Sequence, residues 1–327
     1  MISVVIATYN RAPMVEQTVR AALEQTRPPH EIVVLDDAST DATPQVLAEL
    51  AAHQPCIRLL RREVNSGGIA SWNEAIGAAR GDYLAFCADD DRFLPDHLKE
   101  SLAYLEADPS IGLVHSSFID VVETGGLEQR EPRRLRSAAP LVTSRGNLLR
   151  YLTRYYDWPF HPSTMVLRRE VWSRVGEYNP AYALADTEWF VRVVEQFDVA
   201  MLPRHGVLNR RHPGNWSNRL GSARMQKEIF EIVEGAIGRL WAGRPWGASA
   251  WRAVWRANVR LRLGLTLAQR VRTGHEQAAC AAWHGIVQNT GRRTPEWLER
   301  AGVAMLHGLC SGRVPRLDNV RQRVSPL

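Results

Sequence analysis

The sequence predicts an α/β fold with a mostly parallel central sheet, followed by a helical C-terminal extension. Short β-branched apolar runs alternate with helical patterns through residues 1–105, whereas only helical patterns follow residue 222. Continuous apolar runs of this length are typical of strands that are buried on both faces. Their alternation with helices is typical of a parallel sheet that helices cover on both sides.

The elements of the first half follow one another regularly. Apolar runs predict strands over residues 2–7, 31–35, 57–60 and 83–86. Helical spacing predicts helices over 15–25 and 68–80, and a third up to residue 53 behind the capping residues Ser39, Thr40 and Asp41. Because ligands bind outside the carboxyl ends of such strands, polar residues that follow the strands are the first candidates for a site.

The second half is less regular. Strands are predicted over 112–118 and 164–167, and helices over 169–175 and 186–196. Residues 123–147 are rich in Gly, Pro and Arg and lack an apolar period, so we expect an exposed loop there, and a polar loop over 204–218. The pattern predicts a domain over 1–220, with halves 1–105 and 106–220, and an extension over 221–327 that breaks at Pro245 and Pro295.

Composition limits the classes of protein. The 327 residues are 45% hydrophobic and 23% charged, which excludes wholesale disorder. No apolar run reaches 18 residues, the first ten residues do not resemble a signal peptide, and the four cysteines show no CxxC spacing. We therefore expect a cytoplasmic protein without a structural zinc site or a disulfide framework.

The extension differs from the rest of the chain in charge. Residues 221–327 hold 17 Lys and Arg against 7 Asp and Glu, and six of the eleven tryptophans. Trp251 and Trp255 lie in one row of a predicted helix, with Arg252, Arg256 and Arg260 beside them. Such a helix fits peripheral contact with the inner face of a membrane, or alternatively packing against the catalytic body. Without a recognised motif, the charge does not predict nucleic-acid binding.

Three consecutive carboxylates, Asp89, Asp90 and Asp91, follow the predicted strand 83–86. Carboxylates this close repel one another unless a cation lies among them, and Mg²⁺ and Mn²⁺ prefer oxygen ligands. The alternative is ordinary turn and helix capping before Pro95. The position at the carboxyl edge of the sheet favours the metal site.

Two more polar groups follow strands, at residues 8–10 (TYN) and at Asp36 and Asp37. Their side chains can accept hydrogen bonds from a base or a ribose, and Tyr9 can stack on a base; turn formation is the alternative. The sequence contains neither GxGxxG after the first strand nor GxxxxGK[ST]. Dinucleotide-binding and P-loop sites therefore lose support, and phosphates would have to be held by metal and side chains.

Four motifs in series carry a resemblance: residues 4–11 (VVIATYNR), 35–42 (LDDASTDA), 65–68 (NSGG) with Asn73, and 83–91 (YLAFCADDD) followed by Leu94 and Pro95. In order and spacing they resemble the family 2 glycosyltransferases of GT-A fold over residues 1–220. The resemblance implies transfer of a sugar, with inversion, from a nucleoside-diphosphate sugar to a hydroxyl acceptor, with Mn²⁺ or Mg²⁺ as cofactor. A glycan, a lipid-linked glycan or a metabolite fits as acceptor, and polysaccharide biosynthesis as the setting.

The resemblance also implies roles for single residues. The nucleotide-sugar site would comprise Ala7, Thr8, Tyr9, Asn10, Arg11, Asp36, Asp37, Asn65, Gly68, Asn73 and Asp89. Asp90, Asp91 and His212 would hold the metal, His212 from the late loop 210–217 (RRHPGNWS). Two positions depart from the family pattern: Ala88 replaces the first aspartate of its DXD motif, and Trp72 stands where many relatives carry arginine.

Residues 185–189 (ADTEW) with Arg192 resemble the family's Glu-Asp motif, which implies that Asp186 is the catalytic base. An inverting transfer needs one carboxylate to take the proton of the acceptor hydroxyl. Glu188 lies about 200° around the helix and does not address the same proton. Residues 161–164 (HPST) are candidates for lining the acceptor pocket.

Two alternative functions stay open. A nucleotidyltransferase would use a related sheet, but it would need a Gly-rich basic loop after the first strand, where this chain has TYNR. A non-catalytic nucleotide-binding scaffold would bind nucleotide and metal without turnover. The intact aspartate triplet and Asp186 favour the transferase.

Overall fold

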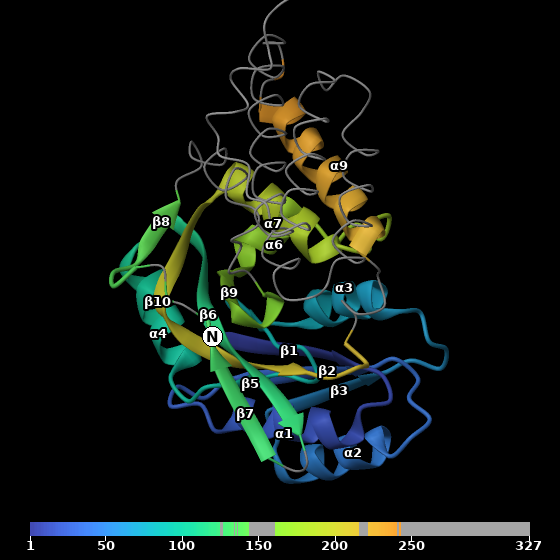
Figure 1. Ribbon diagram of the computed structural model, residues 1–327. Coiled ribbons are helices and arrows are strands. Elements are labelled where there is room, and N and C mark those ends of the chain that lie inside the picture. The colour runs from blue at the N-terminus through green and yellow to red at the C-terminus, as the bar shows by residue number, and fades with distance from the viewer. Residues whose placement is uncertain are drawn as a thin grey trace, which may run out of the picture. The chain divides into compact units, whose positions relative to one another are not determined.

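The computed structural model describes residues 1–124, 127–133, 135, 137–143, 161–215, 222–240 and 242 (Figure 1). The chain divides into two compact units, Met1–Tyr151 with Asp157–Arg219, and Leu152–Tyr156 with Leu220–Leu327. The first unit contains one mixed sheet, in the order β3-β2-β1-β4-β9-β6-β10-β5.

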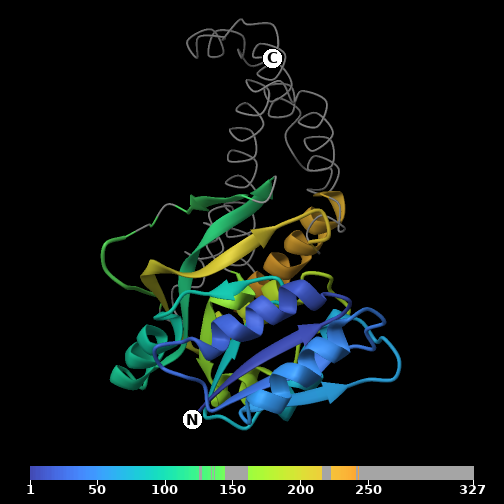
Figure 2. The same ribbon diagram turned by 90° about the horizontal axis from the view of Figure 1, so that it is seen from below.

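The first half of the sheet is parallel. β1 (Ile2–Thr8) lies between β2 (Glu31–Asp36) and β4 (Tyr83–Phe86), and β3 (Ile57–Arg61) pairs with β2. Helices α1 (Ala12–Leu23) and α2 (Thr43–His53) lie side by side on one face, and α3 (Gly68–Ala78) lies on the other (Figure 1). Figure 2 shows the first two helices in front of the strands. The predicted strands and helices of this half are therefore confirmed, because both faces of the strands are covered.

Helix α1 begins three residues earlier than predicted, because Pro13 occupies its first turn, where a missing N–H costs no hydrogen bond. Helix α2 has the expected aspartate before it: Asp41 Oδ1 accepts the N–H of Thr43 at 2.9 Å. The turn before α3 needs Gly67, whose φ of +87° lies in the left-handed region. Each of these helices begins shortly after a parallel strand ends, so the loop between strand and helix lies at the carboxyl edge of the sheet.

The second half of the sheet mixes directions. β9 (Met165–Arg168) is antiparallel to both β4 and β6 (Ile111–Thr124), whereas β10 (Asp198–Arg211) is parallel to β6. The short β5 (Arg92–Phe93) pairs antiparallel with β10. The α/β class is confirmed, and among the described strands parallel pairing is limited to β3-β2-β1-β4 and to the β6–β10 pair.

The predicted loops over 123–147 and 204–218 were wrong for much of their described length. β6 continues to Thr124 and forms a hairpin with β7 (Leu127–Pro132), β8 (Leu141–Thr143) pairs with β10, and β10 itself continues to Arg211. For β7 and β8 the reason is that antiparallel strands at a sheet margin tolerate polar side chains on an open face, so they carry no continuous apolar signal. Also not predicted were β5 and α4 (His97–Ala107), which buries Leu98, Leu102 and Leu105.

Helices α6 (Arg169–Val175) and α7 (Ala185–Gln196) confirm the predicted helices of this region. In the second unit, α9 (Ser222–Leu240) begins where the helical pattern begins. The predicted basic tryptophan helix around 251–260 and the breaks at Pro245 and Pro295 lie outside the described residues, and membrane contact stays a prediction. Among the described residues, no helix is both long and apolar enough to cross a bilayer.

An aromatic cluster joins the two halves of the first unit. Phe86, fully buried at the end of β4, makes edge contacts with Trp72, Trp172, Tyr178 and Trp189 at centroid distances of 5.9 to 6.4 Å. Such contacts add to the stabilisation that burial itself provides. The cluster ties α3, α6 and α7 to the centre of the sheet, directly before the aspartate triplet.

We expect Phe86→Ala to lower the free energy of unfolding by about 3–5 kcal/mol, because it leaves a cavity that four rings cannot fill. Urea denaturation would measure the change. The matched control is Val64→Ala, since Val64 is 74% exposed and its truncation should change stability by less than about 0.5 kcal/mol. Equal losses in the two variants would contradict the assigned role of the cluster.

Candidate active site

The carboxyl ends of β1 and β4 bring Thr8 and Asp89 together. The Thr8 hydroxyl donates to Asp89 Oδ2 at 2.8 Å, and the backbone N–H of Tyr9 also donates to this carboxylate. The ring of Tyr9 is 45% exposed and open to stacking. The adjacent parallel strands β1 and β4 thus place the ring of Tyr9 beside Asp89, an arrangement that suits a nucleotide site.

Asp37 organises the loop before α3. Its Oδ1 and Oδ2 accept the N–H groups of Ser66 and Gly67 at 3.0 and 2.9 Å, while Arg62 Nη1 lies 3.5 Å from Oδ1. The predicted residues Asn65 and Gly68 flank these two amides and are exposed at the same edge. The buried Asp37 therefore holds this loop at the edge of the sheet.

Asn10 and Asp36 stabilise the turns after β1 and β2. Asn10 adopts a φ of +53°, and its side-chain carbonyl accepts the N–H groups of Thr40 and Asp41 at 2.8 and 3.2 Å. Asp36 is buried and accepts the N–H of Ser39 at 2.9 Å. A positive φ at asparagine is uncommon and is held here by the surrounding hydrogen bonds. Ala7, also predicted for the site, pairs with Leu35 inside the sheet.

The three aspartates of the triplet take separate partners. Asp89 contacts Thr8, Asp90 contacts His212, and the buried Asp91 accepts the Ser163 hydroxyl at 2.5 Å and the N–H of Arg210 at 3.2 Å. Burial raises the pKa of Asp89 and of Asp91 above the ordinary carboxyl range, and the charge of Asp90 adds to both shifts. The predicted metal-binding role of Asp91 is opposed by its burial and its structural partners, which leaves Asp90 and Asp89 as the accessible carboxylates.

Asp90 lies in a small polar network at the turn after β10. Its Oδ2 lies 3.0 Å from His212 Nε2, 3.2 Å from Asn215 Nδ2 and 3.6 Å from Arg11 Nη1. The N–H of Gly214 donates to His212 Nδ1 at 3.1 Å, and Arg11 Nη1 lies 2.8 Å from His212 Nε2. Both ring nitrogens of His212 thus have partners within the protein, and Mg²⁺ prefers oxygen ligands, so Asp90 is the better metal ligand of the two.

The residues present fit a divalent metal that takes part of its ligands from a diphosphate. Mg²⁺ and Mn²⁺ are typically held by one or two carboxylates together with phosphate oxygens. Within the described part of the chain, no three His, Cys, Asp or Glu side chains converge as a ready metal cage. Asp90, with Asp89 beside it, supplies the number of carboxylates that such a shared site needs.

Asp186 lies in the first turn of α7, where its Oδ1 accepts the N–H of Thr187 at 2.7 Å. Burial raises the pKa of Asp186 above the ordinary value, and His161 opposes the shift. His161 precedes the short 3₁₀ helix η3 (Pro162–Thr164), and its Nδ1 lies 3.4 Å from Asp91 Oδ2. His161 thus lies close to both the triplet and the predicted base.

Asn73 and the ion pair of Glu188 with Arg192 hold the segment before α7 in place. Asn73 donates to the carbonyl of Tyr178 and accepts its N–H, both at 3.0 Å, so it positions this segment and its amide is not directed at a nucleotide. Glu188 forms an ion pair with Arg192 at 2.9 Å, and Arg192 donates to the carbonyls of Val175 and Glu177. Glu188 is therefore structural, which agrees with its place on the helix.

Sequence reasoning did not assign Ser163 or Asn215. Both lie in motifs that had been singled out, residues 161–164 and 210–217, but their partners, Asp91 and Asp90, come from a distant part of the chain. Contacts between elements separated by 70 residues or more leave no periodic signal in a single sequence.

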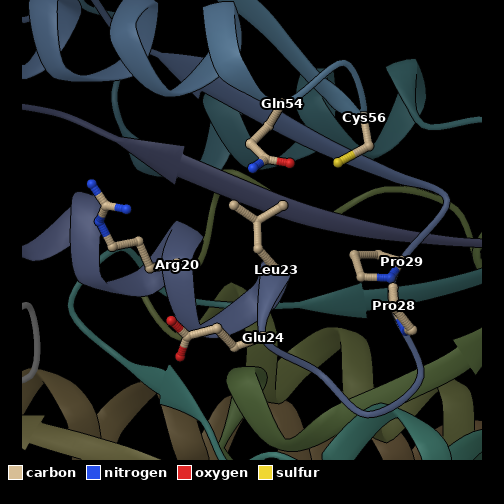
Figure 3. A pocket seen from close by; sticks show the side chains of 7 residues that line it. All are labelled: Arg20, Leu23, Glu24, Pro28, Pro29, Gln54 and Cys56. Carbon is tan, nitrogen blue, oxygen red and sulfur yellow. The ribbon is translucent and has the colours of Figure 1, made fainter.

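A pocket at the opposite edge of the sheet is separate from this site (Figure 3). It lies where α1 ends and before the first residues of β2 and β3. Its lining residues are Arg20, Leu23, Glu24, Pro28, Pro29, Gln54 and Cys56. None of the predicted site residues lines it.

Comparison with known proteins agrees with this arrangement. Residues 3–176, more than half of the chain, match the glycosyl transferase family 2. An uncharacterised protein of Mycobacterium tuberculosis is 29% identical over 222 residues, which cover 65% of this chain and 60% of that relative. The chain thus spans less than two thirds of that protein's length. The succinoglycan biosynthesis protein ExoO of Rhizobium meliloti is 35% identical over 129 residues, 39% of this chain and 36% of ExoO.

A solved structure shares the fold. The crystal structure of S. aureus TarS 1–349 in complex with UDP-GlcNAc superposes with a TM-score of 0.63 at 16% identity, over 98% of this chain and 90% of the TarS 1–349 chain. The sheet, the series of motifs and the family match lead to one conclusion. The chain belongs to glycosyl transferase family 2.

Proposed function

We propose that the chain transfers a sugar, with inversion and with a divalent metal, from a nucleoside-diphosphate sugar to a hydroxyl acceptor in polysaccharide biosynthesis. One observation carries the proposal: Asp89 and Asp90 stand at the carboxyl edge beside Tyr9, with His161 close to both the triplet and Asp186. A nucleotide-facing side and a base-facing side thus meet at one edge of the sheet, as transfer between two substrates requires.

The residues divide the work between donor and acceptor. Tyr9 stacks on the base, and the carboxylates of Asp37 and Asp89 accept hydrogen bonds from the nucleoside. A bound metal, held by Asp90 with Asp89, would stabilise the negative charge that develops on the departing diphosphate. Arg11, which lies 3.6 Å from Asp90, adds a fixed positive charge on the same side.

Asp186 acts on the acceptor. Its carboxylate takes the proton of the acceptor hydroxyl while that oxygen forms a bond to the anomeric carbon. The bond between this carbon and the diphosphate oxygen breaks on the opposite face, so the configuration inverts. The raised pKa of Asp186 makes its carboxylate a stronger base than an exposed aspartate.

The relatives suggest a first donor and a setting. TarS has been crystallised with UDP-GlcNAc, and ExoO is named for succinoglycan biosynthesis. We infer a UDP-sugar as the first donor to test and a polysaccharide or its precursor as the acceptor. The nucleotidyltransferase alternative has no observation in its favour, because residues 8–11 (TYNR) supply no Gly-rich basic loop.

Binding of UDP, GDP, dTDP and CDP, each with Mn²⁺, Mg²⁺ or EDTA, tests the donor side. We expect one nucleotide to stabilise the protein in thermal unfolding only when metal is present, by about 2.7 kcal/mol at a hundredfold excess over Kd. Asp90→Asn should abolish the metal-dependent part. Asp96→Asn, an exposed aspartate on the same segment, is the control. Failure of all four nucleotides with both metals would contradict the proposal and would also exclude a nucleotide-binding scaffold.

Replacement of the base tests the acceptor side. Asp186→Asn should lower kcat about 10²- to 10⁴-fold and leave the nucleotide Kd unchanged, because the amide keeps the shape but accepts no proton. Transfer from radiolabelled donor measures the rate. Glu170→Gln is the matched control, since Glu170 also lies in the first turn of a helix but is exposed. Wild-type turnover in Asp186→Asn would remove this residue from the mechanism.

The pH dependence of transfer follows from the raised pKa of Asp186. Only the deprotonated carboxylate accepts a proton, so kcat/KM should rise with pH and level off above that pKa. Because burial raises this pKa, the acidic limb should lie above the ordinary aspartate value of 3.8. The residual rate of Asp186→Asn should lack this limb. A limb that persists unchanged in the variant would assign it to another group.

A further inference from the structure

Beyond the site described above, one face of the outer strands holds two arginines around a single aspartate. Arg133 Nε donates to Asp120 Oδ2 at 2.8 Å, and Arg211 Nε donates to Asp120 Oδ1 at 2.7 Å. Asn209 Nδ2 also donates to Oδ1, at 2.6 Å. We name Arg133, Asp120 and Arg211 the paired-arginine cluster.

The register of the strands places the cluster on one face. Asn209 is the partner of Asp120 between β10 and β6, and Arg211 follows two residues later. Arg133 comes directly after β7, where its N–H donates to the carbonyl of Phe118 at 3.3 Å. Because side chains alternate along a strand, Phe118 and Asp120 point to the same side as both arginines.

The side chains of the paired-arginine cluster are held in place by several contacts. The Asp120 side chain is only 12% exposed. The guanidinium of Arg133 lies over the ring of Phe118 at 5.0 Å, and the carbonyl of Arg133 lies 2.7 Å from His205 Nε2. Both the backbone and the side chain of Arg133 are therefore held in place, which lowers the entropy that a ligand would have to overcome.

Both guanidiniums keep their outer nitrogens available. Arg133 and Arg211 are 51% and 42% exposed, and each contacts Asp120 through Nε. Among the residues that the structure describes, their Nη1 and Nη2 atoms have no hydrogen-bond partner. Such planar NH₂ groups match the oxygens of a phosphate or a carboxylate. Glu131, the exposed cross-strand neighbour of Asp120, forms no ion pair with either arginine in the described region.

The cluster adjoins the acceptor side of the proposed active site. The ring of Phe118 lies 5.5 Å from that of His161, and His161 Nδ1 lies 3.4 Å from Asp91. Burial lowers the pKa of His161, and Asp90, Asp186 and Arg211 are all close enough to act on it. An acceptor whose hydroxyl approaches Asp186 can therefore reach the arginines with another group.

We propose that Arg133 and Arg211 bind an anionic group, a phosphate or a carboxylate, on the acceptor. The inference rests on the proposed transferase function and adds the chemical class of the acceptor to it. The donor's diphosphate would be met separately, by a metal at Asp90 and by Arg11, which lies 3.6 Å from Asp90.

Binding of three probes to the full chain, in the presence of nucleotide and metal, tests this inference. The probes are methyl glucoside, methyl glucuronide and methyl glucoside 6-phosphate, titrated by calorimetry at about 0.15 M ionic strength to limit non-specific attraction. We expect one or both anionic probes to bind about 10- to 100-fold more tightly than the neutral one, as charged hydrogen bonds allow. The two anionic arms separate phosphate from carboxylate recognition.

Variants assign the preference to the cluster. The double variant Arg133→Gln with Arg211→Gln should lose it, whereas Arg130→Gln should keep it. Arg130 is a matched control on β7, 54% exposed and paired with Glu128, with Val121 as its cross-strand partner on the opposite face. Should the double variant unfold, Arg211→Gln alone should weaken the preference, and the comparison of probes on the wild type stands without any variant.

Two results would overturn the inference. One is equal binding, or no binding, of neutral and anionic probes by a wild type that binds nucleotide with metal. The other is an unexpected result from the double variant. Its preference for anionic probes could survive, or its nucleotide Kd could rise together with the loss of that preference, since the arginines would then serve the donor. A wild type that binds no nucleotide would instead reject the proposed function itself, so the two failures are distinguishable.

Discussion

The buried carboxylate of Asp91 is the interaction on which the site depends. It accepts the hydroxyl of Ser163 and the N–H of Arg210, while its own backbone carbonyl accepts the hydroxyl of Thr18 at 2.7 Å. Residues from α1, from the segment before β9 and from β10 therefore meet at one point. A buried carboxylate is costly unless it is hydrogen-bonded, and these bonds set where its neighbours lie.

Because Asp91 is held inside, Asp89 and Asp90 are presented at the edge of the sheet. The chain thus divides a run of three like charges into one structural carboxylate and two that face possible ligands. Their partners, Thr8 and His212, lie near the beginning and near the end of the first unit in sequence. The charge repulsion that remains is reduced by Arg11 and would be reduced further by a bound cation.

A second set of contacts carries the acceptor side. The aromatic cluster around Phe86 and the paired hydrogen bonds of Asn73 to Tyr178 fix the segment that leads to α7. Asp186 lies in the first turn of α7, so that segment sets its position. The outer strands β6, β7 and β10 then add a face on which charged side chains are ordered by a shared aspartate. In the proposed function, the donor and acceptor sides thus depend on different strands of one sheet, and His161 Nδ1 lies 3.4 Å from Asp91 Oδ2 beside both.

The sequence by itself determined the strand and helix order of residues 1–86, the family and most of the residues at the carboxyl edge. Buried strands are continuous apolar runs, and the polar residues that follow them must lie at one edge, so local pattern suffices there. Only the tertiary structure decided that Asp91 and Asn73 have structural partners, and that part of the stretch predicted as a loop at 123–147 forms strands. Their roles depend on partners 70 or more residues away, or on antiparallel pairing at a sheet margin, and neither leaves a periodic trace in the chain. Tertiary contacts choose which of several equally acidic or polar side chains is buried, and this choice separates a structural residue from one that meets substrate.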